Sequence, residues 1–240
     1  MKPLHSVTFA LLMTFIPAVL ATPVIRLNTT GQPPLNTPNQ QGFMDEVATE
    51  AFRRIGYQLK TVRLPAERGL KNANRGLVDG EMSRIQGLDK RYPNLVRVPE
   101  KIMDWEFVVF SDKPIDLEKG WRSLSNKSIA HINGWKIFEK NTPLSAEVTK
   151  VNNAGRLFKL LFKKRTDYIL YERWGGLYLL REFGAKQVSL RYPPLATKEM
   201  FIYLHNSHSN LVPKLSAAIT AMKDDGTYQT LVARHLSPLE

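Results

Sequence analysis

The most regular hydrophobic pattern in this 240-residue chain begins after Gly42 and has the period of an amphipathic helix. Its apolar side chains recur at three- and four-residue intervals, at Phe43, Val47, Ala48, Ala51, Phe52 and Ile55. Gly56 follows directly, where a glycine commonly ends a helix. The neighbouring predicted elements are strands at Val24–Asn28, Tyr57–Leu64 and Gly80–Ile85 and a helix from Ala66 to about Leu77. This alternation predicts an α/β domain with a largely parallel sheet.

The alternation starts again after a strand at Glu106–Ser111 and a turn signal at Asp112-Lys113-Pro114. The predicted elements of this second unit are strands at Ser128–Asn133, Asp167–Glu172 and Gln187–Tyr192 and helices at Ala154–Lys164 and Gly176–Phe183. A further strand at Glu199–His205 leads to two last helices, one from Leu211 to Gly226 and one from Thr227 to Leu236. The chain is therefore expected to hold two α/β units, the second covering roughly residues 114–195.

The first 21 residues have the pattern of a secretory signal peptide. Lys2 and His5 precede an apolar run from Val7 to Leu20, and small residues suited to cleavage end at Ala21. The run is short for a spanning helix, although an uncleaved anchor is the alternative. The chain has no cysteine, so neither a disulfide nor a lipid-modified thiol is expected. These features predict an exported protein of the bacterial periplasm with a mature chain of residues 22–240.

The formal net charge of +12 raises the question of an anionic partner. Basic residues are spread along the chain, however, and the densest group, residues 159–165, lies on one predicted amphipathic helix. No nucleic-acid-binding motif is present, so we expect no nucleic-acid partner. The charge instead favours small anionic ligands or a solvated surface.

Motifs for catalysis, metals and cofactors are missing from the sequence. It contains no G-x-S-x-G, no H-E-x-x-H and no phosphate-binding glycine loop. His205 and His208 are three residues apart, but no cysteine or acidic residue stands near them in the sequence. We therefore expect no cofactor, no metal site and no enzymatic activity.

The segment from Leu64 to Pro99 is the richest in candidate binding chemistry. Four arginines punctuate it, at Arg68, Arg75, Arg84 and Arg91. Loops and strand ends commonly present ligand-binding groups, and a guanidinium matches a carboxylate in geometry and charge. The segment therefore predicts a carboxylate-binding edge. Thr30, in the polar turn after the first strand, is a further ligand-binding candidate.

Four segments spanning nearly the whole mature chain resemble one family. They are the helix GFMDEVATEAFRRIGY, the segment GLVDGEMSRIQGLDKRYPNLVRV, the strand KKRTDYILYE and the tail HSNLVPKLSAAITAMKDDGTYQTLVARHL. In this order they resemble the bacterial extracellular solute-binding proteins of family 3, the periplasmic receptors of polar amino-acid importers. The resemblance implies two lobes joined by crossover strands, with the ligand enclosed between them.

The implied division places residues 22–110 and 198–240 in the first lobe and residues 111–197 in the second. The crossovers would lie around Phe107–Lys113 and Leu195–Met200, and the lobes would close on a ligand by a hinge motion. By the same resemblance, Arg91, twelve residues after Asp79, would hold the ligand carboxylate. Glu172, five residues after Asp167, would face an amino group.

Several residues depart from the family pattern. Arg84, followed by Ile85 and Gln86, stands where the family has a G-L-T contact, so a guanidinium is expected in the pocket. Gly134-Trp135 replaces a glycine followed by a hydroxyl residue. These differences favour a ligand with an additional anionic or aromatic group. Arg68 is another candidate ligand-binding residue, whereas Trp105 is expected to pack in the core or hinge.

The expected function is therefore a monomeric periplasmic receptor that captures a small polar or anionic solute, an amino acid or related carboxylate. Its partner would be the inner-membrane permease of an ABC-type importer. Two alternatives remain open at the sequence level. One is a dehydratase-like periplasmic enzyme on the same scaffold, and the other is a ligand-sensing subunit for a membrane kinase.

Overall fold

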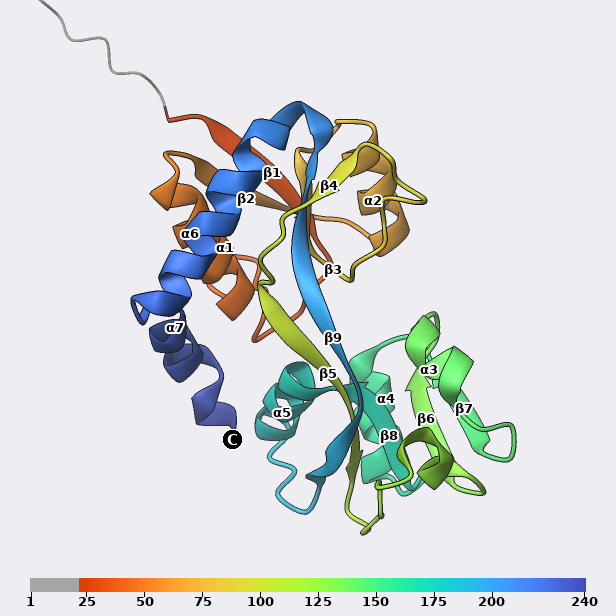
Figure 1. Cartoon of the computed structure of the whole chain (residues 1–240). Coiled ribbons are helices and arrows are strands. Elements are labelled where there is room, and N and C mark those ends of the chain that lie inside the picture. Colours follow the sequence, from red (N-terminus) through yellow and green to blue (C-terminus); the bar gives the residue numbers. More distant parts are fainter. Residues whose placement is uncertain (1–21) are drawn as a thin grey trace, which may run out of the picture.

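The computed structural model describes residues 22–240, so the predicted signal peptide lies outside the described part. Two lobes are joined by two long strands (Figure 1). The strands are β1 (Val24–Thr29), β2 (Gln58–Arg63), β3 (Gly80–Arg84), β4 (Leu95–Arg97), β5 (Met103–Ser111), β6 (Ser128–Ile132), β7 (Glu147–Val151), β8 (Tyr168–Glu172) and β9 (Ser189–His205). The α-helices are α1 (Phe43–Arg54), α2 (Ala66–Asn74), α3 (Lys136–Asn141), α4 (Ala154–Phe162), α5 (Arg173–Glu182), α6 (Val212–Asp224) and α7 (Thr227–His235). Short 3₁₀ helices are η1 (Gly120–Leu124), η2 (Asn206–Leu211) and η3 (Ser237–Leu239).

One curled sheet runs through both lobes in the order β2-β1-β3-β9-β5-β8-β6-β7, with β4 paired to β9. Within each lobe the outer strands are parallel, β2 and β3 to β1 in one and β7 and β8 to β6 in the other. The crossover strands β5 and β9 are antiparallel to each other and to the strands beside them. The predicted two-lobed α/β fold is confirmed, and its sheet is mixed rather than largely parallel.

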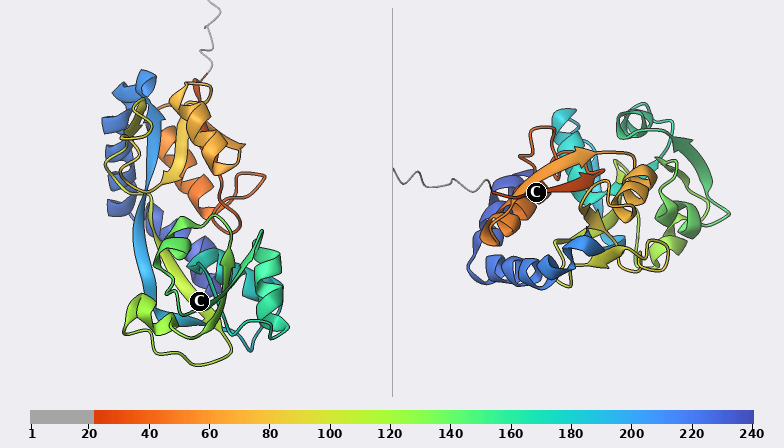
Figure 2. Two further views of the ribbon diagram at one scale, coloured as in Figure 1. Left: turned by 90° about the vertical axis from the view of Figure 1, so that its right-hand side faces the viewer. Right: turned by 90° about the horizontal axis from the view of Figure 1, so that it is seen from above.

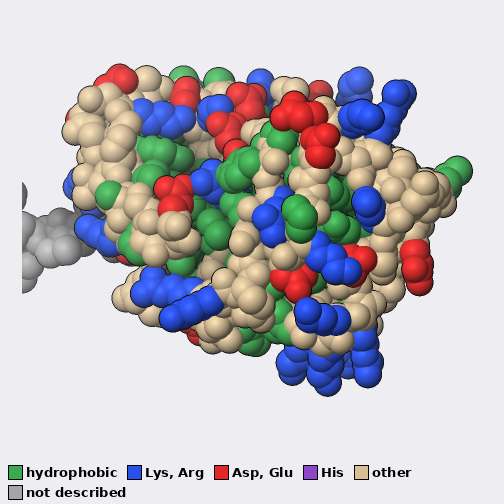
Figure 3. All heavy atoms as spheres, turned by 90° about the horizontal axis from the view of Figure 1, so that it is seen from below, with side chains coloured by type: hydrophobic (Ala, Val, Ile, Leu, Met, Phe, Trp, Pro, Cys, Tyr) green, Lys and Arg blue, Asp and Glu red, His purple; other side chains and the backbone are tan. Residues whose placement is uncertain are grey.

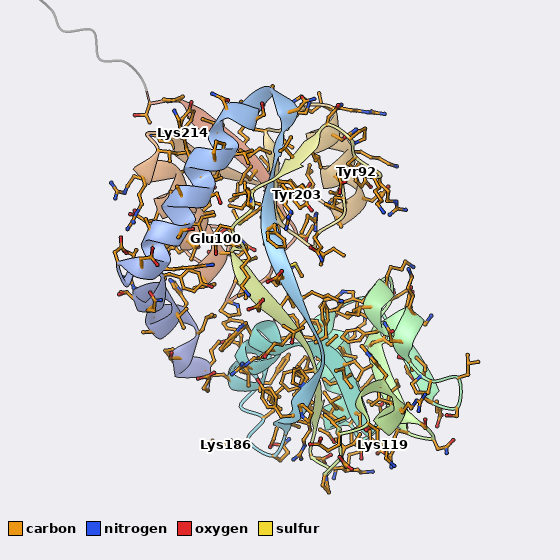
Figure 4. The ribbon with its side chains drawn as sticks, in the orientation of Figure 1. Tyr92, Glu100, Lys119, Lys186, Tyr203 and Lys214 are labelled. Atoms are coloured by element: carbon orange, nitrogen blue, oxygen red, sulfur yellow. The ribbon has the colours of Figure 1, made fainter. Side chains whose placement is uncertain are left out.

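Alternating side chains of the strands supply the cores on the two faces of each lobe. In lobe 1, Ile202 and Leu204 of β9 join the core beneath α1 and α6, while Phe201 and Tyr203 face α2. Tyr203 lies in the interior of this lobe, on β9 (Figure 4). In lobe 2, two buried clusters use alternate residues of β5 and β8 in the same way. Both faces of the sheet are thus covered, so the ends of its strands are left to form a binding site.

The hydrophobic cores divide the chain near the crossovers. The largest cluster takes residues from Ile25 to Met103 and from Met200 to Leu236, whereas two others lie between Phe107 and Leu195. The expected boundaries, 110/111 and 197/198, fall within β5 and β9. Beside the junction of the two lobes, α7 leaves lobe 1 and brings η3 next to α5 of lobe 2 (Figures 1 and 2).

The prediction of two separate strands at Gln187–Tyr192 and Glu199–His205 is wrong, because β9 runs without interruption for 17 residues. Pro193 and Pro194 lie where the register against β5 shifts, between the pairs Phe107–Ala196 and Val109–Arg191. A bulge leaves ladder positions unpaired, so the missing proline N–H groups do not interrupt the strand.

Candidate functional site

A cavity of about 610 Å³ lies between the two lobes beside the crossover strands. Its lining combines loops of lobe 1, the crossovers and two strand ends of lobe 2: Thr29, Thr30, Gly31, Gln32, Leu35, Met44, Arg63, Leu64, Pro65, Ala66, Ser83, Arg84, Ile85, Trp105, Phe107, Trp135, Tyr171, Glu172 and Met200. The volume is in the range typical of small-molecule sites. Four of the six predicted ligand-binding residues line it, namely Thr30, Arg84, Trp135 and Glu172.

Sheet topology explains why these residues meet. The parallel strands β1, β2 and β3 end at Thr29, Arg63 and Arg84, so their carboxyl ends share one edge of lobe 1. In lobe 2 the parallel strands β6 and β8 lead to Trp135 and Glu172. Ligands of open α/β sheets bind at the carboxyl ends of parallel strands. Here the two such edges line one cavity.

Arg84 is the most constrained charged group of the cavity. Its Nη2 atom lies 2.6 Å from Oε2 of Glu81, and Nη1 donates to Oγ1 of Thr30 over 3.4 Å. The side chain of Arg84 is only 14% exposed. Nε and Nη2 are enclosed, which leaves Nη1 as the donor that can reach a ligand. A hydrogen bond from this guanidinium to a ligand carboxylate would be charge-assisted, and such bonds are stronger than those between neutral groups.

Glu81 fixes the position of that guanidinium from below the cavity. Its side chain is 1% exposed, and Nδ2 of Asn28 donates to both carboxylate oxygens over 2.9 and 3.1 Å. Burial raises the pKa of Glu81 to about 7, although the Arg84 guanidinium and the Asn28 amide oppose the shift. Glu81 is therefore a buried support for Arg84, and it does not line the cavity.

Sequence reasoning missed Arg63, the second arginine that lines the cavity. It ends β2, and its Nη2 donates to the carbonyl oxygen of Gly31 in the loop after β1. The N-terminus of α2 follows at once, with Pro65 as an N-cap that supplies no side-chain acceptor. A helix N-terminus favours negative charge. The sequence could have indicated Arg63, because it lies at the end of a predicted strand that was expected to be parallel to the first strand.

Aromatic side chains form the wall contributed by lobe 2 and the crossovers. Trp135 stacks on Tyr171 at a centroid distance of 4.9 Å and on Phe138 at 5.6 Å, and it meets Phe107 edge-on at 6.2 Å. The indole is thus held by stacking within lobe 2 while still lining the cavity. Trp105 packs against clusters of both lobes, and its Nε1 has no hydrogen-bond partner among residues 22–240.

Glu172 is engaged by its own helix. Its Oε2 accepts from the N–H of Trp174 over 2.9 Å, and Oε1 accepts from the N–H of Gly175 over 2.5 Å, so the carboxylate is the N-cap of α5. Burial raises the pKa of Glu172 to about 7, against the opposing effect of these two hydrogen bonds. Both carboxylate oxygens therefore have partners before any ligand is considered.

Arg91 and Arg68 do not line the cavity, and both are exposed. The chain turns after β3, where the N–H groups of Arg91 and Tyr92 both donate to the carbonyl oxygen of Leu88. This turn buries Tyr92 against the cluster under α2 (Figure 4) and leaves Arg91 in solvent. Arg68 lies on the exposed surface of α2. The assignment of Arg91 rested on its distance of twelve residues from Asp79 in the sequence, which does not show that the chain turns here.

Within residues 22–240, no cluster of three or more histidine, cysteine or acidic residues is arranged to hold a metal ion. In the same part of the chain, none of the helices combines the length and the apolar character needed to cross a bilayer.

Comparison with known proteins places this architecture. No protein-family model matches the chain. An uncharacterized protein of Shewanella oneidensis is 24% identical in an alignment of 200 residues, with 76% of this chain and 72% of that protein covered.

Three solved structures share the fold. The GluR0 ligand-binding core in complex with L-glutamate is 15% identical, with a TM-score of 0.75 over 92% of this chain and 100% of that one. A substrate-binding protein of an amino acid ABC transporter is 19% identical (TM-score 0.67, 89% and 99%). A histidine kinase sensor domain with similarity to periplasmic binding proteins is 16% identical (TM-score 0.69, 90% and 96%).

The chain thus has the two-lobed fold of periplasmic binding proteins. The resemblance to the extracellular solute-binding proteins of family 3 is confirmed at the level of the fold.

Proposed function

We propose that this protein is a periplasmic solute-binding receptor that captures a small carboxylate-bearing solute for an ABC-type importer. The observation that carries the proposal is the inter-lobe cavity of about 610 Å³, with Arg84 and Arg63 on one side and an aromatic wall on the other. In this site Arg84, with Thr30 beside it, holds the carboxylate, and the role first assigned to Arg91 moves to Arg84. Trp135 and Glu172 belong to the opposite wall.

The receptor function is supported by what the cavity residues already do. Glu172 is 4% exposed and serves as the N-cap of α5, with each oxygen accepting a hydrogen bond from the first turn of that helix. Glu81 is enclosed and paired with Arg84. A receptor requires only positioned donors and apolar surface, both of which are present.

Ligand capture is tested by thermal unfolding of residues 22–240 in the presence of amino acids, aliphatic organic acids and aromatic acids. A ligand at one hundred times its dissociation constant stabilises the folded state by about 2.7 kcal/mol. For a chain of this size that corresponds to a rise in Tm of about 5–10 °C. Unchanged melting with every member of all three sets would contradict the proposal.

A sensor function is the second candidate, because a histidine kinase sensor domain has the same fold. The two functions share the cavity and differ in the partner. Cross-linking of the ligand-loaded chain in cells, followed by identification of the membrane protein captured, separates them. Capture of a permease would support the importer function, and capture of a kinase would support the sensor function in its place. Light scattering of the purified chain tests the proposed monomer.

A further inference from the structure

Arginine side chains dominate the charge of the cavity. Arg63 and Arg84 contribute guanidinium groups, and Thr30 contributes a hydroxyl. Ser83 and Trp105 also line the cavity, but Oγ of Ser83 and Nε1 of Trp105 are enclosed, as are Nε and Nη2 of Arg84. The charged donors that can face a ligand are therefore guanidinium groups, which favour negatively charged acceptor atoms.

The cavity is poorly suited to an ammonium group. Glu172 is the one acidic residue in the lining, it is 4% exposed, and its two oxygens already accept from the N–H groups of Trp174 and Gly175. Glu81 is enclosed, paired with Arg84 and bonded to Asn28. A ligand ammonium would therefore enter a site with two guanidinium groups and one buried, already hydrogen-bonded carboxylate, where desolvation of a cation is poorly compensated.

Most of the remaining lining is apolar, with Thr29 and Gln32 as further polar side chains. The apolar side chains from lobe 1 and the crossovers are Leu35, Met44, Leu64, Ile85, Phe107 and Met200. Apolar surface of this kind rewards an apolar ligand body by about 25 cal/mol per Å² removed from water.

We infer that the ligand is an organic acid with an apolar body and no ammonium group, bound through its carboxylate to Arg84. This inference rests on the proposed receptor function and narrows its substrate class. It distinguishes simple carboxylic acids from the α-amino acids that differ from them by a single group.

Two matched ligand pairs test the inference by isothermal titration calorimetry on residues 22–240. The pairs are 3-phenylpropanoate with L-phenylalanine and 4-methylpentanoate with L-leucine, and each acid lacks only the amino group of its partner. In at least one pair the acid should bind ten times or more as tightly as the amino acid. An amino acid that binds as well as its acid, or failure of both acids to bind, overturns the inference. The broader thermal screen then shows separately whether the receptor function stands.

Arginine variants test the site with the acid that binds. Arg84→Gln should weaken binding at least tenfold, whereas Arg91→Gln, an exposed arginine outside the cavity, should change it less than twofold. Since Arg84→Gln leaves Glu81 without its cation, the double variant Arg84→Gln/Glu81→Gln checks that lost binding is not lost folding. Tight binding by a folded Arg84 variant would overturn the assignment of the carboxylate to Arg84.

Discussion

At the scale of single residues, the site depends on two buried glutamates with different duties. Glu81 holds a guanidinium, and Glu172 caps a helix. The family resemblance identified Glu172, five residues after Asp167, at the end of a strand that the apolar pattern of residues 167–172 makes visible. It could not identify the use of the carboxylate, because a cap and a ligand acceptor require the same residue at the same strand end. Arg84 could be recognised in the sequence because it departs from the family pattern. Its partner Glu81 could not, because the ion pair forms only in the folded chain.

Glu172→Gln should flatten the dependence of stability on pH. The pKa of Glu172 rises from 4.5 to about 7 on folding because of burial. Its contribution to stability is therefore complete below about pH 4.5 and is lost as the pH rises to about 7, on the order of a few kcal/mol. Urea unfolding at pH 5 and pH 7 measures this loss, which should be smaller in the variant. Glu182→Gln, on the exposed surface of α5, should keep the wild-type slope, and an equal slope in Glu172→Gln would contradict the assignment.

At the scale of elements, the strongly periodic segments were predictable, and those that depend on tertiary pairing were not. The helix after Gly42 and the buried strand β8 carry enough apolar residues to be read directly. β7 was missed because nearly all of its side chains are exposed, and β4 because three residues hold no usable pattern. Pairing with β6 and β9, respectively, makes them strands. The continuity of β9 likewise depends on the bulge opposite its two prolines.

Gly69→Ala tests the close approach of α2 to the buried support of Arg84. An added Cβ would lie 1.9 Å from Nδ2 of Asn28 and 2.7 Å from Oε1 of Glu81, so the helix or the network must move. We expect a loss of about 1–3 kcal/mol in urea unfolding, together with weaker ligand binding. Gly155→Ala on α4 is the control, because its nearest contact is 3.6 Å away. It should stabilise the chain by up to about 1 kcal/mol through helix propensity. Stabilisation by Gly69→Ala would show that this contact is not restrictive.

At the scale of the whole molecule, positive charge is concentrated in one half. Residues 111–197 contain 16 lysines and arginines against 8 aspartates and glutamates. Seen from below, lysine and arginine side chains gather at the lower edge and at the upper right of this face, with acidic and apolar groups between them (Figure 3). An excess of positive charge of this kind raises the local concentration of anions. This excess of positive charge agrees with an acidic solute. The net charge of the sequence predicted the sign of the electrostatic field but not its distribution over the surface.

The C-terminal segment provides a second connection between the lobes, apart from the crossovers. Leu231 and Leu236 anchor α7 in the lobe 1 core, while beyond them Glu240 pairs with Arg173 and the carbonyl oxygen of Pro238 accepts from Arg181, both on α5. None of these residues lines the cavity. Because these contacts exist only while α5 and η3 are adjacent, they bias the proposed hinge motion toward the arrangement seen here.

Removal of residues 237–240 should therefore broaden the distribution of distances between the lobes. The chain has no cysteine, so Lys214→Cys and Lys119→Cys, exposed positions in different lobes (Figure 4), accept spin labels without competition. Exposed ion pairs contribute at most about 1 kcal/mol each, so we expect a few-fold change in populations by pulsed electron resonance. Arg234→Gln, which breaks an ion pair with Glu46 inside lobe 1, should leave the distribution unchanged. An equally narrow distribution in the shortened chain would mean that the crossover strands alone set the angle between the lobes.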